Sequence, residues 1–124
     1  MNVVLWILQG LLAVQFAFHG WLYLFPPAEM VDKFPIAPWF RIFIGFAEWM
    51  ASAGLILPGI TRIQPRLVPL AASGIVIITA SASIFHFSRG ETNYAGFTIV
   101  LFILSSFVAY MRWKVKPIAP RNVL

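Results

Sequence analysis

Four stretches of 19 to 23 residues, almost free of charged side chains, dominate this chain of 124 residues. They cover residues 3–25, 39–57, 67–87 and 95–113. At a rise of ~1.5 Å per residue, a helix of this length crosses the hydrocarbon core of a bilayer, which is roughly 30 Å thick. Backbone polar groups in lipid need partners within their own segment, so each stretch is expected to be a helix. The sequence therefore predicts an all-α, membrane-embedded protein with four transmembrane helices.

The composition agrees with lipid as the surrounding medium. Only 10% of the residues are charged and 60% are hydrophobic, which leaves too little polar surface for a soluble domain. Short connections favour an antiparallel four-helix bundle, and we expect residues 1–124 to form a single transmembrane domain. Within the first connection, one short helical turn is expected around residues 28–34. Pro58 and Gly59 are expected to stop the second helix.

The basic residues predict an orientation. Six lie on the side of the membrane that both termini would share and only three on the other side, where Glu29, Asp32 and Glu91 also lie. This asymmetry predicts that both termini are cytoplasmic, and the expected location is the cytoplasmic (inner) membrane of a bacterium. The six are Arg62, Arg66, Arg112, Lys114, Lys116 and Arg121, and the three are Lys33, Arg41 and Arg89.

Several classes of chemistry are excluded or disfavoured. The chain has no cysteine, which excludes disulfides, zinc thiolates and cysteine-ligated iron–sulfur clusters within it. Its nine lysines and arginines are scattered, so lipid and not nucleic acid is the expected partner. No phosphate-binding loop, nucleophile elbow or HExxH motif is present. A bis-histidine haem is disfavoured because His19 and His86 differ in expected depth by ~6 to 8 Å. A non-haem iron site made of the two histidines and a glutamate is disfavoured because each candidate ligand lies alone on its own helix.

A few ionisable residues fall within the predicted spans, where they are costly and often functional. Glu48 lies near mid-membrane in the second span, and Arg41 lies two helical turns earlier on the same face. His19 and Tyr23 share a face of the first span, and His86 lies near the outer end of the third. We predict that these five residues form a polar pocket in the outer half of the bundle. The alternative is that Glu48 is an interhelical contact without further function.

A series of residues gives the second span a recognisable pattern. It consists of Arg41, Ile44-Gly45, Glu48, Gly54-Leu55 and Leu57-Pro58, with Phe16-Ala17-Phe18-His19-Gly20 in the first span and Ala82 and His86 in the third. This pattern resembles the DoxX-like family of small four-helix membrane proteins, although Tyr23 stands where relatives often have a lysine. The resemblance implies the fold. It also implies a link to quinone-dependent oxidation of sulfur compounds and to membrane-associated oxidoreductase complexes.

Two functions follow as hypotheses. The first is a small accessory or structural subunit that docks in the membrane with a larger, redox-active complex or with further copies of itself. It is favoured by the small size, the missing catalytic motif and the 12 phenylalanines available for contacts in lipid. The second is a quinone-linked redox or proton-handling component, because histidine, arginine and tyrosine donors in an apolar pocket suit quinone carbonyls. Quinone is thus the only cofactor class that the sequence indicates.

Overall fold

The computed structural model describes residues 1–121, which form four long helices packed against one another and contain no strand. The helices are α1 (Asn2–Leu24), α2 (Pro38–Thr61), α3 (Leu67–Ser88) and α4 (Thr92–Tyr110). Two short elements complete them: η1 (Val31–Lys33), within the region expected to form a turn, and η2 (Met111–Val115), a π-helical continuation of α4. Each long helix is long and apolar enough to cross a membrane. The predicted all-α, four-helix membrane fold is confirmed.

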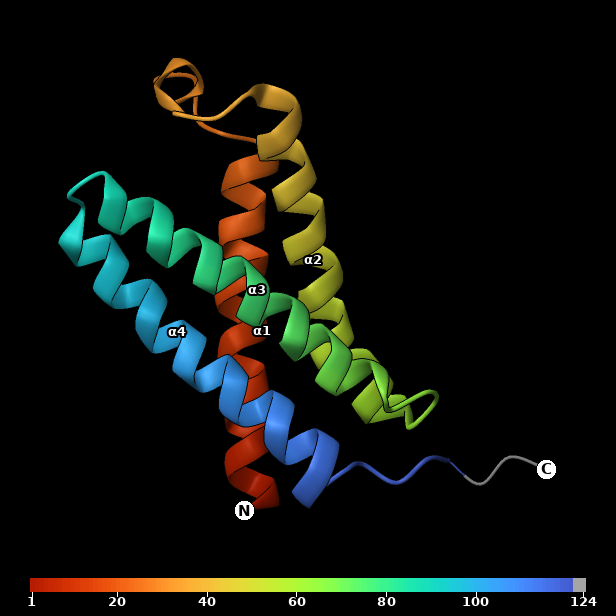
Figure 1. The fold of residues 1–124 in the computed structure, drawn as a ribbon. Coiled ribbons are helices and arrows are strands. Elements are labelled where there is room, and N and C mark those ends of the chain that lie inside the picture. The colour runs from red at the N-terminus through yellow and green to blue at the C-terminus, as the bar shows by residue number, and fades with distance from the viewer. Residues whose placement is uncertain (122–124) are drawn as a thin grey trace.

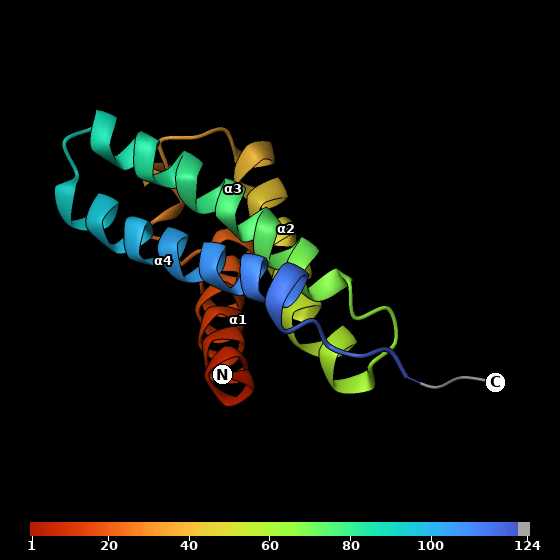
Figure 2. The same cartoon turned by 60° about the horizontal axis from the view of Figure 1, so that its bottom comes forward.

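The helices are arranged as two antiparallel hairpins. Helix α1 packs along α2 and α3 along α4, and the second hairpin crosses the first at a slant (Figures 1 and 2). The start of α1, the 62–66 connection and the segment after α4 lie at one end of the bundle (Figure 1). We call this the basic end because it carries six basic residues and no acidic residue within the described chain. The 25–37 and 89–91 connections lie at the opposite end.

Helices α1 and α2 approach closely at two glycines. A Cβ atom on Gly20 would lie 2.7 Å from the Trp49 ring and 3.0 Å from the carbonyl oxygen of Gly45. A Cβ atom on Gly45 would in turn lie 2.8 Å from Leu24. Small residues at such contacts let the backbones of membrane helices pack together without a side chain between them. The contact brings His19, which precedes Gly20, close to Glu48, which lies about one turn after Gly45.

The core is a thin apolar layer between the hairpins, and most large apolar side chains face outward. Outward-facing apolar side chains are expected of a protein whose solvent is lipid, because the helices need not hide them from water. The large apolar side chains that are fully or almost fully buried are Leu5, Leu12, Phe16, Leu55, Val68, Ile75 and Val108. Where one helix contributes more than one of them, neighbouring members are four or seven residues apart, which places them on one face.

The end of α2 corrects one prediction, because Pro58 and Gly59 do not stop the helix and it continues to Thr61. Pro58 cannot donate a backbone hydrogen bond, but this removes only one bond near the end of a long helix, a loss that membrane helices tolerate. Gly59 packs against Trp6, whose ring would lie 2.6 Å from an added Cβ. The helix stops instead at Arg62, whose φ of 59° is left-handed.

Candidate functional site

A carboxylate–histidine pair joins α1 to α2 inside the membrane-spanning region. Nδ1 of His19 lies 2.7 Å from Oε2 and 2.9 Å from Oε1 of Glu48. The Glu48 side chain is completely buried, whereas that of His19 is 39% exposed. Within residues 1–121, His19 is the only basic side chain within 4 Å of the Glu48 carboxylate. With Nδ1 protonated, the imidazole donates to the carboxylate, and its Nε2 remains available to another partner.

The pair borders a cavity of about 290 Å³ formed by all four helices. Helix α1 contributes a stripe, Gln15, His19 and Tyr23, at the four-residue spacing that places side chains on one face. The remaining lining is largely apolar or hydroxylic: Phe16 from α1, Glu48 from α2, Ile78, Thr79, Ala82 and His86 from α3, and Tyr94, Phe97, Thr98 and Leu101 from α4. The structure thus brings together four of the five predicted pocket residues, namely His19, Tyr23, Glu48 and His86.

Arg41 is the predicted residue that the structure places elsewhere. Its guanidinium donates a hydrogen bond to the backbone carbonyl of Tyr23 and lies 5.3 Å from the ring centroid of Phe34. The carbonyl belongs to the last turn of α1, where carbonyl groups lack helical partners and the helix dipole attracts a cation. Arg41 therefore secures the end of α1 and does not line the cavity. The Tyr23 ring lies in the cavity wall, with its centroid 4.4 Å from that of His19.

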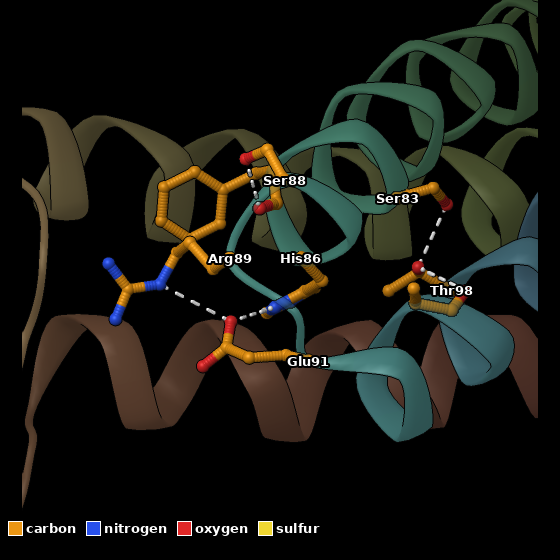
Figure 3. Close-up of polar contacts among 8 residues, drawn as sticks. Ser83, His86, Ser88, Arg89, Glu91 and Thr98 are labelled. Atoms are coloured by element: carbon orange, nitrogen blue, oxygen red, sulfur yellow. Dashed lines mark hydrogen bonds and ion pairs between the residues drawn. The ribbon is translucent and has the colours of Figure 1, made fainter.

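His86 lines the same cavity but pairs with a different carboxylate. Its Nδ1 lies 2.9 Å from Oε1 of Glu91, and the Nε of Arg89 lies 3.4 Å from the same oxygen (Figure 3). The hydrogen bond from His86 lowers the pKa of Glu91 below its ordinary value of 4.5, and the charge of Arg89 adds to this effect, although partial desolvation opposes it. His86 therefore pairs with Glu91 within the α3–α4 turn and not with Glu48.

The threonine and serine hydroxyl groups near the cavity are already hydrogen-bonded within their own hairpin. Thr79 donates to the carbonyl of Ile75 at 2.8 Å, a common arrangement for hydroxyls in membrane helices. Ser83 and Thr98 are 2.8 Å apart and link α3 to α4 (Figure 3). Apart from His86, which pairs with Glu91, the acid–base groups that line the cavity are the His19–Glu48 pair and the phenols of Tyr23 and Tyr94. Such a set can hold and move a proton, and it can donate to a polar group on an otherwise apolar ligand.

Sequence reasoning missed a second buried polar cluster at the basic end. Arg112 is only 2% exposed, and its Nε donates to Oε1 of Gln9 at 2.7 Å. Gln9 is itself fully buried and donates from Nε2 to the carbonyl of Leu55. The spacing could have revealed this cluster. Arg112 follows the buried residues Ser105 and Val108 by seven and four positions, so all three share the buried face of one helix.

A bundle of four membrane-spanning helices, with a buried carboxylate that pairs with a histidine beside a cavity, defines a class of small integral membrane protein. The sequence matches the DoxX-like family over residues 7–108, and the chain therefore belongs to that family. The match includes both His19 and Glu48 and ends before Arg112. It confirms the resemblance carried by the pattern in the first three spans. No curated protein and no solved structure matches the chain.

Proposed function

We propose that the cavity beside His19 and Glu48 binds the head group of a quinone or quinol and that the pair exchanges a proton with it. The observation that carries this proposal is a fully buried carboxylate, 2.7 Å from an imidazole, in a mostly apolar cavity. The volume of about 290 Å³ is near the lower limit of the range, roughly 300–1,000 Å³, that is usual for ligand sites. A single-ring head group suits this volume, with its apolar tail in the surrounding lipid.

The hydrogen-bond geometry supports a defined proton step. With Nδ1 protonated, His19 donates to Glu48, and this bond fixes the orientation of the ring. Nε2 then accepts a proton from a quinol hydroxyl, and in the reverse direction the imidazolium donates it to a quinone carbonyl. Oxidation of one quinol releases two electrons and two protons. The first proton is held by the His19–Glu48 pair, and the second leaves after the first has passed to solvent.

The two electrons need an acceptor, which we assign to a partner redox protein in the membrane. In this account the chain is an accessory subunit that supplies a quinone site and proton handling to a larger complex. A second candidate function, a purely structural subunit, is favoured by the fact that the pair links α1 to α2. The first function requires a cavity that is open to a ligand, whereas the purely structural function does not.

The orientation predicted from the basic residues belongs to the same proposal. We place both termini in the cytoplasm of a bacterial cell, because short loops rich in lysine and arginine remain on that side. The cavity then lies toward the outer face of the inner membrane. Protons released from a quinol there would leave on the side opposite the termini.

Binding of a short-chain ubiquinone to protein in lipid nanodiscs tests the proposed site. Ala82 lines the cavity, and Ala82→Phe adds a ring that fills part of it. Gly96→Phe is the matched control, since Gly96 has no neighbouring atom within 4 Å of an added Cβ and lies on the exposed surface of α4. We expect saturable quinone binding by the wild type and by Gly96→Phe, and its loss in Ala82→Phe.

Either of two results would reject the quinone site. One is an absence of saturable binding by the wild type, and the other is equal affinity in Ala82→Phe and Gly96→Phe. Thermal unfolding of both variants shows whether the added ring has damaged the fold. Copurification of the untagged partner proteins with Ala82→Phe then separates assembly from ligand binding, because an accessory role alone would not depend on the cavity.

A further inference from the structure

The buried arginine at the basic end has a hydrogen-bonding capacity that the described chain does not fill. A guanidinium has five N–H groups. In Arg112, one on Nε donates to Gln9, and those on Nη1 donate to Asn2 at 2.8 Å and to the carbonyl of Lys116 at 2.9 Å. Nη2 is buried and has no partner within residues 1–121. Three donors are therefore used and two remain.

The charge of Arg112 is also uncompensated by the groups that hold it. All three hydrogen-bond acceptors are neutral: two side-chain amides and one backbone carbonyl. The ring of Trp6, 5.5 Å from the guanidinium carbon, adds a cation–π contact but no negative charge. A buried cation is normally paired with an anion, because burial removes the hydration that stabilises its charge.

No acidic side chain of the protein can supply that anion. Glu29, Asp32 and Glu91 lie in the connections at the opposite end of the bundle, and Glu48 pairs with His19. The basic end instead gathers further positive charge. Arg62 and Lys116 line a cavity of about 420 Å³ together with Arg112. A neighbouring cavity of about 340 Å³ is lined by Arg112 and Arg66.

We propose that Arg112, Arg62 and Lys116 form a binding site for a phosphate group at the basic end. The planar fork of a guanidinium suits the oxygens of a phosphate, and the two free N–H groups on Nη2 would bind them. The two flanking cations complete the neutralisation of a group with one or two negative charges. Gln9 acts as a positioning residue, because its bond to the Leu55 carbonyl turns its oxygen toward Arg112.

The phosphate has two potential sources, a phospholipid head group or inorganic phosphate in solution. Two binding assays on the purified full chain distinguish them. In the first, inorganic phosphate is titrated against chloride at equal ionic strength while thermal unfolding is followed in uncharged detergent. In the second, native mass spectrometry measures retention of phosphatidylglycerol against diacylglycerol, which has the same chains but no phosphate.

Binding in either assay supports the site and names the source. We expect a bound phosphate to raise Tm by about 3 °C or more, since it stabilises only the folded state. Arg112→Lys keeps the charge but loses the fork, and we expect about a tenfold lower affinity, the effect of losing a charge-assisted hydrogen bond. An absence of both the Tm increase and the selective lipid retention in the wild type would overturn the proposal.

A matched pair of exposed lysines separates a defined site from general attraction to anionic lipid. Lys116 lines the cavity, whereas Lys114 lies two residues earlier on the same end and lines neither cavity. Both changes, Lys116→Gln and Lys114→Gln, remove one charge from an exposed side chain. We expect Lys116→Gln to weaken binding several-fold and Lys114→Gln to leave it within twofold. Equal weakening by both would overturn the proposal, even if Arg112→Lys fails to fold.

Discussion

The close contact between α1 and α2 makes a single methyl group at Gly20 a sensitive probe of the site. The added Cβ of Gly20→Ala would lie 2.7 Å from the Trp49 ring, whereas carbon atoms in contact are normally about 3.5–4.0 Å apart. The same Cβ would lie 3.0 Å from the carbonyl oxygen of Gly45, which belongs to the backbone of α2. The two helices must therefore separate by roughly 1 Å or the ring must move. Separation of the helices displaces His19, the neighbouring residue, relative to Glu48.

The magnitude follows from comparison with a matched control. Gly10 also lies within α1, but an added Cβ there has no neighbour within 4 Å. Replacement of glycine by alanine inside a helix gains about 0.5–1 kcal/mol of stability, and this gain is common to both variants. Overpacking at a tight contact costs about 1–3 kcal/mol, and it applies to Gly20→Ala alone. The difference in unfolding free energy between the two variants is thus expected to be about 1–3 kcal/mol.

Reversible unfolding in mixed detergent micelles measures this difference. We expect Gly10→Ala to be at least as stable as the wild type and Gly20→Ala to be less stable. We also expect Gly20→Ala to bind short-chain ubiquinone more weakly, because His19 and Glu48 no longer meet at 2.7 Å. Equal stability of the two alanine variants would refute the close helix contact and the reasoning that connects it to the pair.

Three further predictions concern the charged groups. Glu48→Leu is expected to lower the free energy of unfolding by about 1 kcal/mol or more. Glu48→Gln is expected to fold and to assemble but to lose quinone-dependent turnover. If stability, assembly and turnover all survive in Glu48→Leu, both functions are contradicted. Because the pKa of Glu91 is lowered in the folded protein, its contact with His86 stabilises the α3–α4 turn above about pH 4.5, and this contribution is lost as the pH falls through the lower folded value. Hydrogen exchange of the turn should accelerate in that range, and Glu91→Gln should abolish the pH dependence. A reporter fused after Leu124 is expected to be active in the cytoplasm, and periplasmic activity would reverse the proposed orientation.

The fold could be predicted from the sequence because lipid leaves few alternatives. A long apolar segment in a bilayer has to be a helix, and short connections then fix the antiparallel order. The end of α2 was predicted wrongly because Pro58 is a strong helix breaker in water but removes only one hydrogen bond near a membrane helix end. Packing of Gly59 against Trp6, from another helix, could not be read from the local sequence.

Helical spacing predicts which side chains of the candidate site share a face of their helix. It does not predict which hydrogen-bond partner a long side chain will reach. Spacing placed His19 and Tyr23 on the cavity face of α1. It also placed Arg41 on the face of Glu48, but the carbonyl at the end of α1 is nearer to the guanidinium and competes for it. Arg112 was counted only as a basic residue at the end of the fourth span, because its burial depends on contacts with Gln9, more than 100 residues away.

Infrared difference spectroscopy during electrochemical reduction of bound quinone tests the central claim most directly. The chain has only four acidic side chains, so a carboxyl band that changes on reduction has few sources. We predict a carboxylate band that changes when the quinone is reduced and is absent in Glu48→Gln. A spectrum of the quinone-loaded wild type without any carboxyl change, or a band that persists unaltered in Glu48→Gln, would contradict proton exchange between the ligand and the His19–Glu48 pair.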